Sequence, residues 1–440
     1  MLARLEHDRL FRPLLLTIFA VGLVARIVMV AIAPPQAESV LEPLADATDY
    51  HTLAISMLEG RGYHGPGGPT AFRPPAYPVF LAAIYAVAGK GNLLAVAAVQ
   101  VLLGALNVLL IAWLARVAGF RRLVQLFAAS MFALYPAFVF QTPQILTEVL
   151  ARTLLLVACG YFLLMIERAC WRTAVVCGAL WALAIFNKSV LLAAAPFLGV
   201  VSILAWPGGW KSRARLACAF ALPPAILLGA WTTRNAVVSG GAFIPVSTNF
   251  PITFAQGVTE FSYYTNEWYG EDVELLEVPE DYLNNTQLRF YDDIEDEIAT
   301  GESYAAQARA WIGENSGVFA ILTVRKALHF WGASIRNSPA VRIVALVSMG
   351  PVLLGGWVML AARLRRRRWR ARYVLLCLAV ALPVTIPYAI SQCDVRYRLA
   401  LIDPLWMVLF AALLARFSMG EEEHTPEQDL QQEAQDSEAQ

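Results

Sequence analysis

The chain has 440 residues, and its composition excludes an ordinary soluble protein. Hydrophobic residues make up 58% of the chain and charged residues 15%, whereas soluble proteins average about 45–50% and about 25%. Lysine and arginine together number 34, as do aspartate and glutamate, and this balance argues against a nucleic-acid partner. The six cysteines lack paired spacing, which indicates neither a disulfide framework nor a metal site. Most of the chain is therefore expected to lie in lipid.

Hydropathy predicts an all-α polytopic membrane protein with about 10 transmembrane helices, since each crossing needs about 20 predominantly apolar residues. Loops at one set of helix ends are rich in arginine and lysine, and such loops stay in the cytoplasm. Both termini are therefore predicted to be cytoplasmic, and the first span is predicted to be a retained anchor. The predicted spans are 13–33, 92–116, 123–141, 149–166, 171–187, 189–206, 214–232, 341–362, 372–390 and 399–416.

Two segments are expected outside the membrane, about 34–91 and about 233–340. Within the first, the apolar run 75–87 has 13 residues, too short to span and typical of an interfacial helix. The second carries fifteen carboxylates between Glu260 and Glu314, and its end, 303–331, has helical apolar spacing. The acidic stretch 260–302 is interpreted as a solvated lid, an acceptor platform or filler.

The expected domains are a transmembrane catalytic module (1–232), an acidic external insertion (233–340), C-terminal spans (341–417) and a disordered acidic cytoplasmic tail (418–440).

Charged residues near lipid are costly and usually functional. Many stand at the predicted external ends of spans, although they are far apart in sequence, which predicts one polar cavity at the outer leaflet. Arg26 is the deep exception, and it either snorkels or lines the cavity. The residues at the external ends are Asp46, Asp49, Arg73, Glu148, Arg152, Lys188, Arg234, Asp394, Arg396 and Arg398.

The first external loop has the most informative residues, and each has two interpretations. Asp46 is either a general base or the N-cap of a short helix, and Asp49 is either its partner or a solvated acid. Arg73, held by the two following prolines, suits a phosphate or anchors a lipid headgroup. His51 and His64 are too loosely spaced to indicate a metal site.

The motifs later in the chain give weaker evidence of function when each is taken alone. Glu148 opens a span and either caps it or pairs with Arg152 at i,i+4. Arg234 lies in a stretch, Trp231–Asn235, that is also typical of an interfacial belt. External arginines at 396 and 398 run against the orientation rule, which favours a functional role for them.

Six short motifs in this order resemble the family 39-like membrane glycosyltransferases of the C-type superfamily, which includes protein O-mannosyltransferases and the lipid A aminoarabinose transferase. The resemblance extends from the first span to Leu399. The motifs are D-A-x-x-Y (Asp46, Tyr50), G-x-G-Y (Gly60, Gly62, Tyr63), R-P-P-x-Y-P (Arg73 to Pro78), T-E (Thr147, Glu148), W-T-x-R-N (Trp231 to Asn235) and R-Y-R-L (Arg396 to Leu399).

The resemblance implies a C-type glycosyltransferase fold and an enzyme that takes a sugar from a polyprenyl-phosphate donor. It implies that Asp46 is the catalytic acidic residue, that Arg73 holds the donor phosphate and that Glu148 is a second acidic residue. Ala47 replaces a second acid found in protein mannosyltransferases, and the long C-terminal domain of the lipid A enzyme is absent. The acceptor, whether lipid, protein or glycan, therefore stays open.

The hypothesis is inverting transfer at the outer face of a bacterial cytoplasmic membrane. Asp46 is the base, Glu148 assists, and Arg73 is the main phosphate ligand. No cofactor is required, although the two carboxylates could bind a divalent cation weakly. The supporting cations are Lys188, Arg234, Arg396 and Arg398, and the supporting residues are Asp49, Tyr50, Tyr63 and Tyr77.

Three alternatives remain. A polymerase or ligase would use a diphosphate-linked donor. A transporter would show inverted repeats and midplane polar residues, which the sequence does not show. A non-enzymatic scaffold would tolerate the loss of Asp46.

Overall fold

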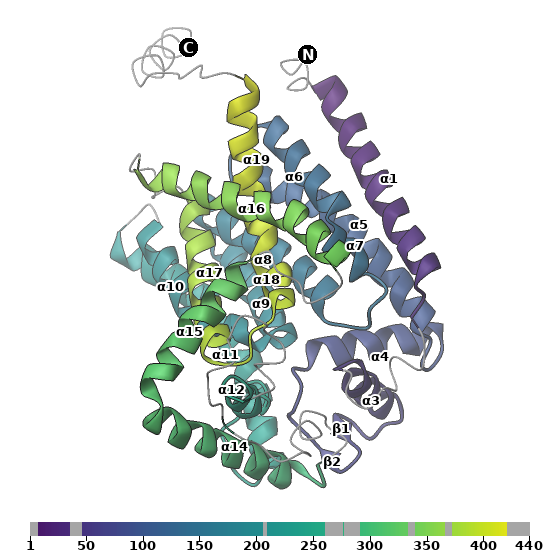
Figure 1. Ribbon diagram of the computed structural model, residues 1–440, viewed down its shortest axis with the longest axis vertical. Coiled ribbons are helices and arrows are strands. Elements are labelled where there is room, and N and C mark those ends of the chain that lie inside the picture. Colours follow the sequence, from purple (N-terminus) through teal and green to yellow (C-terminus); the bar gives the residue numbers. More distant parts are fainter. Residues whose placement is uncertain are drawn as a thin grey trace.

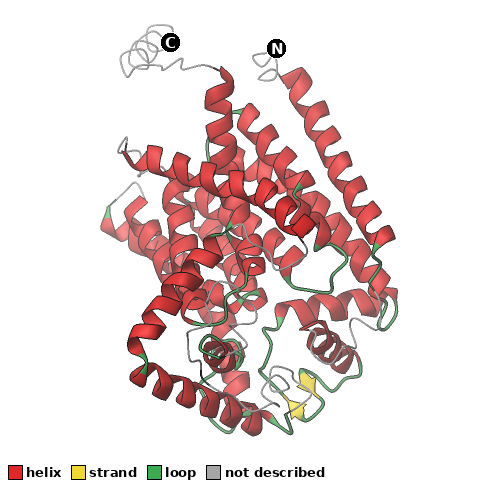
Figure 2. Ribbon diagram, in the orientation of Figure 1, coloured by secondary structure: helices red, strands yellow, loops and turns green. Residues whose placement is uncertain are grey.

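The computed structural model describes residues 8–35, 46–205, 209–259, 276, 291–332, 339–365 and 372–419. Figure 2 shows that these are almost entirely helical, with one small antiparallel hairpin. Helix α1 begins and α19 ends at one end of the molecule, and α3, α12, α14 and the hairpin lie at the other (Figure 1).

The elements follow one another along the chain as α1 (Asp8–Ile32), α3 (Asp46–Leu58), β1 (His64–Gly65), β2 (Gly68–Pro69), α4 (Ala76–Ala88), α5 (Leu93–Val117), α6 (Arg122–Leu134), α7 (Pro136–Phe140), α8 (Glu148–Arg168), α9 (Trp171–Asn187), the 3-10 helix η2 (Ser189–Ala194), α10 (Ala195–Ala205), α11 (Trp210–Val238), α12 (Phe250–Gln256), α14 (Ile294–Glu314), α15 (Ser316–Trp331), α16 (Pro339–Arg365), α17 (Arg372–Ile390), α18 (Val395–Leu401) and α19 (Asp403–Met419).

Six described helices, α1, α5, α8, α11, α16 and α17, are long and apolar enough to cross a membrane, and the pair α18–α19, bent by 65°, makes a seventh if counted as one span. This is fewer than the ten predicted. The predicted span 123–141 is two helices, because Pro136 begins α7 and the preceding Tyr135 is extended, as residues before proline tend to be. The predicted spans 171–187 and 189–206 correspond to apolar helices shorter than 18 residues.

The interior is a continuous apolar cluster that draws mainly on α5, α6, α8, α9, α16, α17 and α19. Arg26 of α1 is buried within it, and its Nη1 donates to the carbonyl oxygens of Gly22 (2.9 Å) and Ala133 (3.0 Å). A Cβ atom at Gly104 would lie 2.6 Å from Arg26 Nε, so the glycine makes room for the guanidinium. Arg26 thus neither snorkels nor lines the cavity described below; it joins α1 to α5 and α6.

The two predicted external segments do contain helices. The short run 75–87 is α4, whose Tyr77, Leu81 and Tyr85 pack with Tyr50 of α3. The spacing at 303–331 corresponds to two helices, α14 and α15, which meet at Asn315. The acidic stretch 260–302 lies outside the described residues except for 276 and 291–302, and the tail 420–440 lies wholly outside them.

Candidate functional site

A cavity of about 1040 Å³ opens between the ends of several helices. Its walls come from the end of α1, the start of α3, the α7–α8 loop, η2, the segment 245–256 and the α17–α18 loop. Four charged side chains line it, Asp46, Arg73, Lys188 and Arg396. These were predicted to meet at a polar cavity, and the structure brings them together from four separate parts of the chain.

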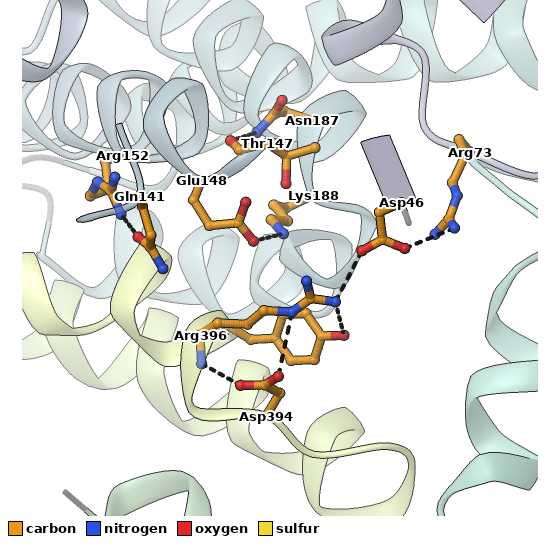
Figure 3. A network of polar contacts seen from close by, with 11 residues as sticks. Asp46, Arg73, Gln141, Thr147, Glu148, Arg152, Asn187, Lys188, Asp394 and Arg396 are labelled. Carbon is orange, nitrogen blue, oxygen red and sulfur yellow. Dashed lines mark hydrogen bonds and ion pairs between the residues drawn. The ribbon is translucent and has the colours of Figure 1, made fainter. Parts of the chain in front are cut away.

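Asp46 lies between two guanidinium groups (Figure 3). Its Oδ1 accepts from Arg73 Nη2 at 2.9 Å and its Oδ2 from Arg396 Nη2 at 3.0 Å. Because both oxygens bind guanidinium groups, the arrangement favours a site residue over a helix cap. Burial alone would raise the pKa of Asp46, but the charges of Arg73, Arg396 and Lys188 prevail and lower it. Asp46 is therefore a carboxylate at rest.

Arg73 is held rigidly from behind. Its Nε donates to Asp49 Oδ2 at 2.9 Å, and its backbone carbonyl accepts a 2.7 Å hydrogen bond from the Tyr63 hydroxyl. The Asp49 side chain is 2% exposed, whereas that of Asp46 is 26% exposed. Asp49 therefore orients the arginine from the interior, while Asp46 faces the cavity. The two prolines that follow Arg73 restrict its backbone further.

Glu148 and Lys188 form a second pair beside the first (Figure 3). Lys188 Nζ lies 3.1 Å from Glu148 Oε1. Glu148 does not pair with Arg152, whose Nη1 instead donates to Gln141 Oε1 at 2.6 Å. Lys188 lines the cavity, and Glu148 is buried behind it. Glu148 therefore binds Lys188 from the side away from the cavity.

Arg396 follows the N-cap of α18. The backbone N–H of Arg396 donates to Asp394 Oδ1 at 2.8 Å, and the Asp394 carboxylate also lies 3.5 Å from Arg396 Nε. The neighbouring Tyr397 stacks on Tyr388, with ring centres 4.5 Å apart and planes inclined by 9°, and both rings line the cavity. Sequence reasoning missed this aromatic pair, although Tyr397 stands inside the R-Y-R-L motif.

Arg398 and Arg234 were predicted to bind phosphate, but the structure places both away from the cavity lining. Arg398 is fully buried, and its Nε donates to Asp403 Oδ1 at 2.7 Å. Residues two apart on a helix point about 200° from one another, so Arg396 and Arg398 face opposite sides. Arg234 donates to the carbonyl oxygens of Thr70 (2.5 Å) and Tyr63 (2.9 Å). Neither lines the cavity; Arg398 holds α18 to α19, and Arg234 holds the first loop to α11.

Of the three tyrosines predicted to support the site, one lines the cavity and two do not. Tyr50 lines the cavity, and burial raises its pKa, so it remains a hydroxyl donor. Tyr77 is buried and donates to Gln100 Oε1 at 3.0 Å, while Tyr63 supports the backbone at Arg73. Tyr63 and Tyr77 thus shape the loop without facing the cavity.

The lining charges suit an anionic group. Three cations and one carboxylate face the space, whereas the partners Asp49, Glu148 and Asp394 stand behind the cations. Guanidinium groups bind the oxygens of a phosphate in pairs. In the described part of the chain, no group of three or more His, Cys, Asp or Glu side chains is arranged to hold a metal ion.

The fold resembles solved membrane transferases. A crystal structure of the Archaeoglobus fulgidus oligosaccharyltransferase without ligand matches over 91% of this chain and 50% of its own, with a TM-score of 0.54 and 14% identity. A structure of that enzyme with an inhibitory peptide and a dolichol-phosphate matches over the same shares, with a TM-score of 0.54 and 13% identity. A third, with zinc and sulfate, covers 90% of this chain and 48% of its own, with a TM-score of 0.52 and 13% identity. The chain spans about half the length of these proteins.

The chain therefore has the all-α fold of the C-type membrane glycosyltransferases. Residues 72–230 also match the family model described as dolichyl-phosphate-mannose-protein mannosyltransferase. The family match confirms the resemblance to lipid-phosphate glycosyltransferases, and its range contains two of the six motifs, R-P-P-x-Y-P and T-E. No curated protein matches the chain significantly.

Proposed function

We propose that this chain transfers a sugar from a polyprenyl-phosphate donor to an acceptor hydroxyl or amine. The observation that carries the proposal is Asp46 held between Arg73 and Arg396 on the wall of a large cavity. The family match, whose description names a lipid-phosphate sugar donor, supports it. So does the dolichol-phosphate bound in a protein of the same fold.

The reaction needs a base and a stabilised leaving group. Asp46 takes the proton of the acceptor as the acceptor oxygen or nitrogen bonds to the anomeric carbon. The bond from that carbon to the phosphate oxygen breaks, and its electron pair leaves with the polyprenyl phosphate. Arg73, Arg396 and Lys188 bind the additional negative charge. In-line displacement of this kind inverts the anomeric centre.

In the free protein, Asp46 occupies the guanidinium groups that the donor phosphate needs. A bound phosphate would compete for Arg73 and Arg396, which weakens their hold on the carboxylate. The pKa of Asp46 would then rise from its lowered value, because the cations that lower it are shared with the phosphate. Donor binding therefore converts a paired carboxylate into a better base.

The cavity is proposed to open on the outer face of a cytoplasmic membrane. Helix α8 begins at Glu148, beside the cavity, and ends at Arg168. Helix α5 likewise carries Arg116 in its last turn and ends at Val117, close in sequence to Arg121 and Arg122. Since arginine-rich ends stay in the cytoplasm, the cavity lies at the opposite, external ends.

Transfer of labelled hexose from polyprenyl-phosphate donors, measured in source-cell membranes containing the full chain, tests the proposal. Wild-type protein should move label to an acceptor, and Asp46→Asn should not. Asp292→Asn is the matched control, because Asp292 is exposed and lies outside the cavity. Equal transfer by wild type and Asp46→Asn would contradict the assignment of Asp46. The fraction that takes up the label identifies the acceptor as lipid, protein or glycan.

A further inference from the structure

One wall of the cavity is lined by uncharged hydrogen-bonding side chains that the proposed chemistry does not use. Ser247 and Asn249 precede or begin α12, Gln256 ends it, and Gln392 lies in the α17–α18 loop. We call these four residues the amide wall. In Figure 1, α12 lies apart from α7 and from the end of α1, where the cavity lining is mostly apolar (Ala33, Pro34, Pro35, Phe140, Pro143, Ile145).

The side chains of the amide wall are available to a ligand. Gln256 is 3% exposed, lines the cavity, and makes no side-chain hydrogen bond within the described ranges. Two other hydroxyls that line the cavity are already used: Thr253 Oγ1 donates to Asn249 O (3.2 Å) and Ser391 Oγ to Pro387 O (2.6 Å). Neither the amide oxygen nor the amide nitrogen of Gln256 is among the fully enclosed polar atoms that lack a partner, so both are open to the cavity, where a ligand can pair with them in place of solvent.

The amide wall is held rigid from outside the cavity. The backbone N–H of Gln392 donates to Thr253 O at 2.9 Å, which joins the α17–α18 loop to α12. The buried Lys326 of α15 donates from Nζ to Gly257 O (2.9 Å) and to Ser391 O (3.2 Å). The backbones touch here, because a Cβ atom at Gly257 would lie 2.8 Å from Ser391 Cα. The wall is thus built before any ligand arrives, which lowers the entropic cost of binding.

The chemistry of the wall indicates the class of ligand. Amides and a hydroxyl both donate and accept hydrogen bonds, and none of the four side chains carries a charge. The stacked rings of Tyr388 and Tyr397 line the same cavity and offer an apolar surface. A ligand with many hydroxyl groups on a partly apolar ring matches this combination.

We propose that the amide wall binds an uncharged sugar ring, with Gln256 and Gln392 as specificity-determining residues. The inference rests on the proposed function, in which a phosphate occupies Arg73 and Arg396. The sugar is either the one carried by the donor or one at the end of a glycan acceptor, and the two sources require the same chemistry from the wall.

Calorimetric titration of the full chain in lipid nanodiscs tests this proposal. The probes are farnesyl phosphate, farnesyl phosphates that carry mannose, glucose or glucuronic acid, and neutral oligosaccharides added after farnesyl phosphate. The variants are Gln256→Leu and Gln392→Leu. Gln307→Leu is the matched control, because Gln307 is exposed on α14.

If the wall holds the donor sugar, mannosyl or glucosyl phosphate binds more tightly than farnesyl phosphate, and Gln256→Leu weakens it roughly tenfold. If the wall holds an acceptor sugar, the two variants bind the donors as tightly as wild type does but no longer bind the neutral oligosaccharide. In both cases, farnesyl phosphate itself binds the variants as it binds wild type, which shows that they are folded.

Two results would overturn the proposal whichever sugar the wall holds: wild-type affinity for every saccharide in both variants, or competition by a serine- and threonine-containing peptide where no saccharide competes. Where the neutral oligosaccharide does not bind, equal affinity of the wild type for glucuronyl and neutral hexosyl phosphates would overturn it as well. A wild-type protein that fails to bind farnesyl phosphate contradicts the proposed function instead. The oligosaccharide titration can then still be read without the phosphate.

Discussion

Two arginines of one motif have opposite environments. Arg396 and Arg398 stand two residues apart, and each binds an aspartate. The Arg396 side chain is 33% exposed and reaches Asp46 at the cavity, whereas Arg398 and Asp403 are both 0% exposed. An ion pair that a ligand can reach is able to exchange partners, and one enclosed by protein is not. The first pair is therefore suited to chemistry and the second to holding α18 against α19.

The largest expected effect on folding belongs to the buried pair. Arg398→Met should destabilise the protein by about 3–5 kcal/mol, because it leaves Asp403 charged and buried. Tyr135, which donates to Asp403 Oδ2 at 2.8 Å, would be its remaining side-chain partner among the described residues. Thermal unfolding in detergent measures this loss. The double variant Arg398→Met/Asp403→Asn should recover part of it, and a single variant as stable as wild type would contradict the structural role.

The cavity-facing arginine should show the reverse pattern. Arg396→Met should lower transfer roughly 10²–10³-fold, the loss expected when a group that binds developing charge is removed. Its unfolding temperature should stay close to that of wild type, because the side chain is partly exposed. Equal losses of stability in Arg396→Met and Arg398→Met would remove the distinction between the two pairs.

Glu148 offers an intermediate case, since it is buried but serves a cavity-facing cation. Glu148→Gln should leave Lys188 less well held, and we expect a several-fold rise in KM for the donor with a smaller change in kcat. Steady-state kinetics with a fixed acceptor measures both constants. A large fall in kcat with unchanged KM would instead indicate that Glu148 acts on the reacting atoms.

The smallest effect concerns pH. A carboxyl whose folded pKa is lowered contributes stability above its unfolded pKa, near about 4, and loses it as the pH falls through the lower folded value. For Asp46, kcat/KM should therefore not decline through its protonation between about pH 8 and pH 5. The acid limb of kcat, measured on the donor-bound protein, should lie at higher pH than that of kcat/KM, because the bound phosphate shares the cations that lower the pKa of Asp46. Acid limbs at the same pH for both constants would contradict the exchange of partners between Asp46 and the phosphate.

Much of the fold could be predicted because membrane helices are long apolar runs. The described helices differ from the predicted spans where local chemistry interrupts an apolar run, as at Pro136, and where a helix has fewer than 18 residues, as α9 has. Hydropathy averaged over a window does not detect such a break.

The site residues, too, could be predicted only in part from the sequence. Asp46, Arg73, Lys188 and Arg396 stand out in sequence because charges beside lipid are rare. Charge alone could not separate Arg396 from Arg398, since that difference depends on the direction of each side chain around α18. Gln256 was missed because an uncharged polar residue beside apolar ones has no distinctive pattern until folding leaves it without a partner.

Binding of farnesyl phosphate to wild type and Asp46→Asn tests the central claim, that Asp46 and the donor phosphate compete for the same guanidinium groups. Asp46→Asn removes the competing charge while keeping the shape. It should therefore bind farnesyl phosphate more tightly, by roughly tenfold, although it transfers no sugar. Binding that is unchanged or weaker in Asp46→Asn would contradict the account.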